Sequence, residues 1–348
     1  MTRLALVMIA RDEAAAIARA LQSARPHVER MIVLDTGSTD ATPAIAAGLG
    51  AEVSHFAWTD DFAAARNAAL ALSDAAWNLV LDADEWVESG AAGALSAEAL
   101  PAAGGDVLGI VRRDSALDAS GAAGRAQCWI PRVLPRGARY EGRIHEQPVG
   151  PWRERRLPLV LGHDGFLPEA LARKGGRNEA LLMQALQATP QDAYLWFHLA
   201  KEHQARGRPA QAAACFAEAL RLAPADAPWR HGLVVRALTG LKSAGRLDEA
   251  LQLADAEVAR WSDSPDFYFA VGDLYLECAA QCPDRALADF LPVVEAAWKR
   301  CLEIGERPDL DGAVAGRGGR LAAQNLAAFY ETLGQPDRAA PYKAMAEG

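Results

Sequence analysis

Residues 78–86 read NLVLDADEW, and this stretch decides how the first half of the chain is interpreted. Its apolar start is typical of a buried β-strand. Three carboxylates then follow within four residues, at Asp82, Asp84 and Glu85. A strand that leaves a core and ends in this much negative charge suggests the hypothesis of a functional site at its tip.

The sequence around this stretch alternates between strand and helix patterns. The predicted strands and the helices between them cover residues 4–9, 13–24, 30–35, 37–50, 51–58, 60–75 and 77–84, in that order. Such alternation predicts a parallel sheet covered by helices, in which ligands bind beyond the carboxyl ends of the strands. Asp35 and Asp82 both lie at the end of a predicted strand, where this fold places its chemistry.

The pattern changes after residue 104. Short β-like runs punctuated by Gly and Pro fill residues 104–165 and are expected to extend the sheet. From about residue 171 the chain is helical, alanine-rich and repetitive, and residues 194–224 follow the tetratricopeptide pattern of large and small positions. A non-repetitive helical bundle is the alternative interpretation. We expect two domains, an α/β domain over 1–168 and an all-α, tetratricopeptide-like helical repeat domain over 169–348.

The composition excludes some classes of function. The chain has 348 residues, and 36 Lys and Arg against 45 Asp and Glu give a net charge of −9. A surface of that sign disfavours nucleic acid as a partner, because neutralising phosphates dominates that affinity. The N-terminal apolar run is too short for a signal peptide, and no window is apolar enough to span a membrane, so we expect a cytoplasmic protein.

The five cysteines are irregularly spaced, at Cys128, Cys215, Cys278, Cys282 and Cys301. An odd count without regular spacing disfavours a disulfide framework. A zinc site would need a second pair of ligands beside the two cysteines that lie four residues apart. We therefore expect buried, structural thiols.

The D-x-D pair has a specific chemical use. Two aspartates separated by one residue point the same way when the chain is extended, so both can present oxygens to one hard cation. Mg²⁺ or Mn²⁺ is commonly held by one or two carboxylates, with substrate phosphates completing its shell. Such an ion would offset the charge that builds up on a departing diphosphate. A solvated acidic turn is the alternative interpretation.

Four ordered segments carry a resemblance to a known family: LVMIARDEAAAIARALQSA (6–24), IVLDTGSTDATPAIA (32–46), FAWTDDFAAARNAAL (56–70) and WNLVLDADEW (77–86). Together they resemble the family 2 glycosyltransferases of the GT-A fold, and within them a bacterial branch with tetratricopeptide repeats after the catalytic domain. The resemblance implies a nucleotide-sugar donor, most often a UDP-sugar, a Mn²⁺ or Mg²⁺ ion, and inversion at the anomeric carbon.

The resemblance also implies roles for residues near the donor. Asp35 matches the aspartate beside the nucleoside, although Thr36 stands where many relatives have a second acidic residue, which leaves the nucleobase open. Asp84 is expected to bind the metal and to be essential for catalysis, and Asp82 to face the metal or the ribose. Arg66 matches an arginine of the nucleotide pocket, its alternative being a helix-surface arginine paired with Asp61.

Further donor-binding residues are expected in two other segments. Arg11 and Glu13 follow the first strand, where the donor base would stack. Arg177 lies just before the first repeat, and with Arg173 and Lys174 it would close over the diphosphate or form a solvated basic helix start.

The segment YEGRIHEQPV (140–149) supplies the expected base and a further metal ligand. An inverting transferase needs a base to take the acceptor proton. Glu146 is the first candidate and Glu141 the second. His145 is expected to be a third metal ligand or to contact the diphosphate. His163, after a later predicted strand, is expected to bind the donor.

The expected function is therefore an inverting, metal-dependent glycosyltransferase of the hexosyltransferase type. Its acceptor would be a peptide or protein held by the repeats, or a cell-envelope glycan, and the chain could form a homodimer. The alternative is a non-catalytic interaction scaffold that retains the fold. The presence of Asp35, Arg66, Asp82 and Asp84 together favours the enzyme. Phosphate-loop, G-x-G-x-x-G and G-x-S-x-G motifs are absent from the sequence.

Overall fold

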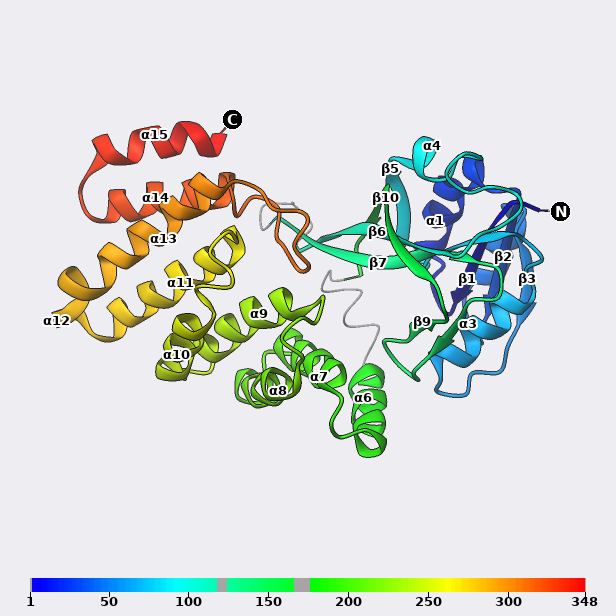
Figure 1. The fold of residues 1–348 in the computed structure, drawn as a ribbon, viewed down its shortest axis with the longest axis horizontal. Helices are drawn as coiled ribbons and strands as arrows, with labels where there is room; N and C mark the ends of the chain where they lie inside the picture. The colour runs from blue at the N-terminus through cyan, green and yellow to red at the C-terminus, as the bar shows by residue number, and fades with distance from the viewer. Residues whose placement is uncertain (1, 118–123, 166–175, 348) are drawn as a thin grey trace. The chain divides into compact units, whose positions relative to one another are not determined.

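A computed structural model describes residues 2–117, 124–165 and 176–347. The chain divides into two compact units, one of Met1–Ala119 and Cys128–Leu181, the other of Ser120–Gln127 and Leu182–Gly348. The predicted order, an α/β domain followed by a helical domain, is confirmed (Figure 1). Among the described residues, no helix is long and apolar enough to cross a membrane.

The first unit is built on an eight-stranded mixed sheet (Figure 1). Its strands, in spatial order, are β3 (Glu52–His55), β2 (Arg30–Asp35), β1 (Leu4–Ala10), β4 (Trp77–Val80), β7 (Arg125–Pro135), β6 (Val107–Ala116), β10 (Arg153–His163) and β5 (Glu85–Ser89). The first four are parallel, as predicted. β7 is antiparallel to β4, and β5 is antiparallel to β10. β8 (Arg139–Glu141) and β9 (Gln147–Val149) form a separate two-stranded sheet.

Both faces of β1, β2 and β4 are buried, which explains the largely apolar sequences of these strands, whereas β3 at the edge of the sheet is half-buried or exposed. On β1, Leu6 and Met8 pack in the same core cluster as α1 (Ile17–Ala24). Val7 belongs to the cluster on the other face, together with Ala69 of α3 (Phe62–Ala71). The shorter helices of this unit are η1 (Arg25–His27), α2 (Thr42–Gly48) and α4 (Ala91–Ala94).

The predicted strand over 77–84 is shorter than expected. β4 ends at Val80, and β5 begins at Glu85. The residues between them form a turn, closed by a hydrogen bond from the Glu85 N–H to the Asp82 carbonyl oxygen (3.0 Å). The D-x-D pair therefore lies in a turn between two strands of the sheet and not at the end of one extended strand.

The second unit is helical and is arranged as successive helix pairs (Figure 1). Its helices are α6 (Arg177–Ala188, which begins in the first unit), α7 (Ala193–Ala205), α8 (Pro209–Leu222), α9 (Arg230–Ser243), α10 (Leu247–Glu257), α11 (Pro265–Gln281), α12 (Pro283–Arg285), the π-helix η2 (Ala286–Phe290), α13 (Leu291–Ile304), α14 (Arg320–Thr332) and α15 (Pro336–Glu347). Gly207, Gly245 and Gly334 end helices with left-handed φ angles of 66°, 72° and 69°. Gly207 lies within the predicted repeat over 194–224, and glycine is the residue that adopts this conformation without strain.

The cysteines only partly follow the expectation of buried thiols. All five are free, and Cys215, Cys278 and Cys301 are buried. Cys128 is half-buried and Cys282 is exposed. Cys282 directly follows α11 as its C-cap residue, and its side chain is exposed there.

Candidate active site

Arg66 joins two of the predicted site carboxylates. Its Nη2 lies 2.5 Å from Asp82 Oδ1, and its Nε donates to Glu146 Oε1. The Arg66 and Glu146 side chains are 7% and 8% exposed, so the ion pair is buried. The alternative of a surface pair with Asp61 is wrong, because Asp61 caps α3 by accepting the Ala64 N–H (2.8 Å). Burial would lower the pKa of Arg66, but Asp82 and Glu146 raise it well above its ordinary value.

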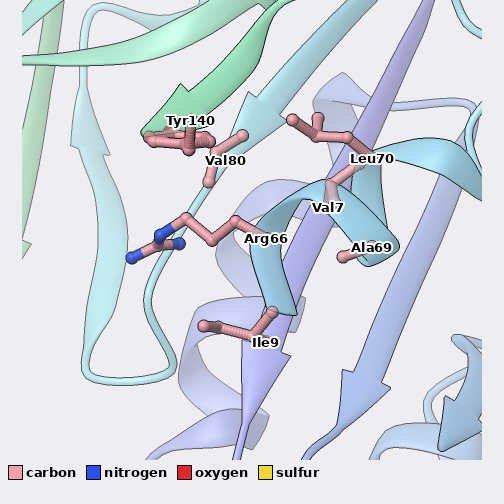
Figure 2. A pocket seen from close by; sticks show the side chains of 7 residues that line it. All are labelled: Val7, Ile9, Arg66, Ala69, Leu70, Val80 and Tyr140. Atoms are coloured by element: carbon pink, nitrogen blue, oxygen red, sulfur yellow. The ribbon is translucent and has the colours of Figure 1, made fainter. Parts of the chain in front are cut away.

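The stem of Arg66 crosses an apolar hollow between α3 and the sheet (Figure 2). The hollow is lined by Val7, Ile9, Arg66, Ala69, Leu70, Val80 and Tyr140. The Tyr140 ring lies 5.4 Å from the guanidinium carbon, within cation–π range. Arg66 Nη1 is buried and has no hydrogen-bond partner within the described part of the chain. Packing of the apolar part of the Arg66 side chain thus positions the guanidinium. The Nη1 donor of that guanidinium is available to bind a ligand.

Two further arginines, which the sequence analysis missed, complete a buried charge network. Arg132 donates to Glu85 through Nε (2.9 Å) and Nη2 (2.8 Å), and its Nη2 also reaches Asp82 Oδ2 (2.7 Å). Arg113 Nη1 lies 3.1 Å from Glu85 Oε1. One signal was present in the sequence: Arg132 interrupts an apolar run, and an arginine on a buried strand needs a carboxylate partner.

Asp82 is held between two guanidiniums. Burial would raise the pKa of its carboxyl, but Arg66 and Arg132 outweigh that effect and hold the pKa far below its ordinary value. Arg132 shows the converse, because burial would lower its pKa while Glu85 and Asp82 raise it. Both Asp82 oxygens therefore accept from arginine in this arrangement.

Asp84 has a different partner. Its Oδ2 lies 3.6 Å from His163 Nε2, and the Nδ1 of the same ring lies 2.9 Å from Ser115 Oγ. The strand register explains this meeting: His163 on β10 is opposite Glu85 of β5 and opposite Ser115 of β6. His163, expected to bind the donor, is thus placed beside the second aspartate of the D-x-D pair.

The expected metal-ligand set of Asp82, Asp84 and His145 is not assembled. Among the residues that the structure describes, no group of three or more His, Cys, Asp or Glu side chains could hold a metal ion. Asp84 and His163 remain as a pair with one oxygen and one imidazole nitrogen facing each other. Such a pair fits a divalent cation when substrate phosphates complete the shell.

The loops after β1 and β2 form the neighbouring part of the site. Asp35 accepts hydrogen bonds from the Gly37 and Ser38 N–H groups, and His55 Nδ1 lies 3.3 Å from its Oδ2. Burial would raise the pKa of Asp35, but the hydrogen bonds from Ser38, Gly37 and His55 lower it overall. Thr36 is buried and donates to the Ala10 carbonyl oxygen (3.2 Å).

Arg11 and Glu13 lie in the loop after β1. Arg11 is exposed, with its Nε 3.8 Å from Asp12 Oδ2. The Glu13 N–H donates to Thr42 Oγ1 (2.8 Å) at the start of α2. Asp12 Oδ1 accepts from the Thr39 N–H (2.7 Å), so this loop is bound to the loop that follows β2.

Among the described residues, three other than glycine adopt left-handed backbone conformations, and each lies in a loop. They are Asp12 (φ 55°), Asp60 (φ 56°) and His145 (φ 53°). Residues with strained backbones of this kind cluster at functional sites. His145 directly precedes Glu146, so the strained turn carries the carboxylate that binds Arg66.

The remaining candidates are more peripheral. Glu141, the second base candidate, is exposed at the end of β8. The Arg177 guanidinium carbon lies 5.1 Å from the Phe62 ring centre, at the start of α3. Arg173 and Lys174 lie outside the described residues.

Comparison with known proteins bears on what this site does. Residues 5–133 match the model of the family described as Glycosyl transferase family 2. Residues 5–133 are therefore similar to a family 2 glycosyltransferase domain. A TPR repeat-containing protein of Synechococcus elongatus is 54% identical over 85 residues, which are 24% of this chain and 21% of that protein. An uncharacterized glycosyltransferase of Rickettsia felis is 40% identical over 85 residues, 24% of this chain and 30% of the relative. This chain thus matches less than a third of the length of either relative.

Two solved structures resemble parts of this chain. The glucosyl-3-phosphoglycerate synthase of Mycobacterium tuberculosis, in complex with Mn²⁺, UDP and glucosyl-3-phosphoglycerate, covers 35% of this chain and 46% of its own, at 22% identity and a TM-score of 0.27. A TPR protein of Thermus thermophilus covers 44% of this chain and 73% of its own, at 19% identity and a TM-score of 0.36. With the family match and the TPR-containing relative, the predicted order of a GT-A domain followed by tetratricopeptide-like repeats is confirmed.

Proposed function

We propose that the protein is an inverting glycosyltransferase that uses a nucleoside-diphosphate sugar together with Mn²⁺ or Mg²⁺. A UDP-sugar is the first candidate for this donor. The observation that carries this proposal is the contact between Asp84, in the turn between β4 and β5, and His163, at the end of β10, whose Oδ2 and Nε2 atoms lie 3.6 Å apart. One residue separates Asp84 from Asp82, which binds the buried Arg66. A candidate cation-binding pair and a buried guanidinium, bound through neighbouring aspartates, support a diphosphate site in the region that matches family 2 glycosyltransferases.

The roles of the donor-binding residues follow from their contacts. Arg66 Nη1, which has no hydrogen-bond partner in the described structure, is assigned to an oxygen of the donor diphosphate. Asp35, ionised and fixed by backbone N–H groups, is assigned to the nucleoside. The Thr36 hydroxyl donates its hydrogen bond to a backbone carbonyl oxygen. The nucleobase would therefore be recognised by other groups, such as the exposed imidazole of His55.

Asp84 and His163 would hold the divalent cation, which when bound stabilises negative charge on the leaving diphosphate. Asp82 is assigned to keeping Arg66 in place. Glu146 remains the first candidate for the base, and its Arg66 contact fixes the carboxylate within the site. Because Glu146 accepts from Arg66, binding of diphosphate to that guanidinium and activation of the acceptor would be coupled.

The helical unit is assigned to acceptor binding. Stacked helix pairs of this kind present extended surfaces to peptides and proteins. We propose a polypeptide acceptor, with a cell-envelope glycan as the second candidate, in a cytoplasmic setting.

The test is donor hydrolysis across a panel of nucleotide sugars, with Mn²⁺ and with EDTA, scored by released nucleoside diphosphate. We expect metal-dependent release from one donor, and its loss in Asp84→Asn. Asp106→Asn is the matched control, because Asp106 forms an exposed ion pair with Arg153 at the start of β6 and β10. Release that is equal in EDTA, or retained by Asp84→Asn, would contradict the metal assignment. Absence of any nucleotide binding would instead support a non-catalytic scaffold.

A further inference from the structure

Glu85 is the third carboxylate of the stretch 82–85, and its surroundings differ from those of the other two. Its side chain is fully buried, with 0% exposure. Oε2 accepts from Arg132 Nε (2.9 Å) and from the Asp82 backbone N–H (3.1 Å). Oε1 accepts from Arg132 Nη2 (2.8 Å) and Arg113 Nη1 (3.1 Å). Four donors therefore saturate one carboxylate, as burial of a charge requires.

These contacts close the D-x-D turn from both ends. The Asp82 N–H donates to the Glu85 side chain, while the Glu85 N–H donates to the Asp82 carbonyl oxygen (3.0 Å). Asp84 lies inside this doubly bonded turn, between the two residues that are tied together. Arg132 adds a third tie, since its Nη2 bonds both Glu85 and Asp82.

We propose that Glu85 is a positioning residue that fixes the D-x-D turn and so aims Asp84 at the cation beside His163. Arg132 and Arg113 hold Glu85 in place, and Glu85 itself touches neither the cation nor the substrate. This inference rests on the proposed function, because it assigns Asp84 to the cation. Replacing a residue that orients a metal ligand without binding the metal itself typically lowers metal affinity or activity by about 10–100-fold.

A single substitution at Glu85 would leave two buried arginines without their carboxylate and could prevent folding. The network offers charge-balanced variants instead. Arg66, Arg113 and Arg132 face Asp82, Glu85 and Glu146. Removing the charges of Glu85 and Arg113 together leaves two positive groups against two negative groups.

The experiment compares two double variants that differ only in the side chain at position 85. Glu85→Gln with Arg113→Met keeps an acceptor oxygen for the Asp82 N–H. Glu85→Met with Arg113→Met keeps the volume and the charge balance but removes that acceptor. The first readout is hydrogen exchange of the peptide covering residues 79–88, which does not depend on activity. The second is Mn²⁺ affinity in the presence of UDP, with kcat and KM for the donor.

We expect the Met variant to exchange its turn amides about tenfold faster than the Gln variant, and to lose about 10–100-fold in Mn²⁺ affinity and kcat. The donor KM measured at saturating Mn²⁺ should stay within about threefold, because the nucleotide contacts are untouched. Glu257→Met is the control for loss of a buried carboxylate: Glu257 pairs with Arg230 (2.5 Å) and the Trp261 indole N–H (3.1 Å) in the helical unit. This control variant should lower the free energy of unfolding and leave kcat for donor hydrolysis unchanged.

Equal exchange, equal Mn²⁺ affinity and equal kcat in the two double variants would overturn the proposal. Faster turn exchange without any change in Mn²⁺ affinity or kcat would also overturn it, because Glu85 would then have a structural role alone. A wild-type protein that binds no Mn²⁺ and turns over no donor would refute the proposed function separately. In that case the exchange data alone decide whether Glu85 holds the turn.

Discussion

Asp82 and Asp84 are separated by one residue, yet their surroundings are opposite. Asp82 lies between Arg66 and Arg132, whereas Asp84 faces His163. The difference arises because the chain turns after β4, so the two side chains no longer point the same way as they would on an extended strand. An aspartate between two guanidiniums anchors a network, and an aspartate beside an imidazole can bind a cation.

The first prediction concerns Asp82 and pH. Its pKa is lowered in the folded state, so its contribution to stability is present above the unfolded pKa of about 3.9 and is lost as pH falls further. Asp82→Asn should lower the free energy of unfolding at pH 7 by about 3 kcal/mol, because two buried arginines lose a partner. Urea unfolding at a series of pH values measures this loss. The difference in the free energy of unfolding between wild type and variant should become smaller below about pH 4. A gap that is constant with pH would contradict the ion-pair account.

The second prediction separates the two base candidates. Glu146→Gln should lower kcat by about 100-fold or more, the usual contribution of a positioned base. Glu141→Gln is its matched control, since Glu141 lies in the same hairpin but is exposed, and it should change kcat less than about threefold. Steady-state kinetics with the identified donor and acceptor measure both. The reverse order of effects would move the base to Glu141.

At the scale of elements, the edge of the sheet depends on one glycine. A Cβ on Gly162 of β10 would lie 2.2 Å from the Trp86 indole of β5. Arg19 also lies over that indole, with its guanidinium carbon 3.7 Å from the ring centre, and it binds Asp164 (2.5 Å). The half-buried Trp86 side chain is therefore packed against both Gly162 and Arg19.

The third prediction follows from this packing. Gly162→Ala should destabilise the protein by about 1–3 kcal/mol, because the ring must move or the strands must separate. Gly48→Ala is the control: it lies at the end of α2 with nothing within 4 Å of the added carbon, and should be neutral or stabilising by up to about 1 kcal/mol. Thermal unfolding checks both. A Gly162→Ala variant as stable as wild type would contradict the described packing of β5 on β10.

Some elements were predictable from the sequence for physical reasons. The strands β1, β2 and β4 are largely apolar because both of their faces are buried. Glycines end the repeat helices because these positions have a left-handed conformation. The turn that separates β4 from β5 was not predicted, because Asp82–Glu85 looks like an extension of the strand until its hydrogen bonds are seen. The pairing of Glu85 with Arg132 joins residues 47 positions apart, and no local pattern encodes that meeting.

At the scale of the whole molecule, the thiols report on the integrity of the helical unit. Burial raises the pKa of Cys215 to about 11 and that of Cys301 well above its ordinary value. Reaction with an alkylating reagent needs the exposed thiolate, so both cysteines should react only when the unit opens. Cys282, which is exposed, reacts without opening.

The fourth prediction is therefore a difference in alkylation within one native sample. At pH 8, Cys282 should react with iodoacetamide at least about 100-fold faster than Cys215 and Cys301, and the difference should vanish in denaturant. Mass spectrometry of digested protein gives each rate. Similar native rates for all three would contradict the described burial of the helical unit.

The most direct test of the central claim is a Mn²⁺ titration by electron paramagnetic resonance in the presence of UDP, on wild type, Asp84→Asn and the Asp106→Asn control. The account predicts one bound Mn²⁺ per chain in wild type and in Asp106→Asn, and a loss of about 100-fold or more in affinity in Asp84→Asn, which leaves the ion one protein ligand short. If Asp84→Asn binds Mn²⁺ as tightly as wild type, or if wild type binds none, the assignment of this turn as a cation and diphosphate site is contradicted.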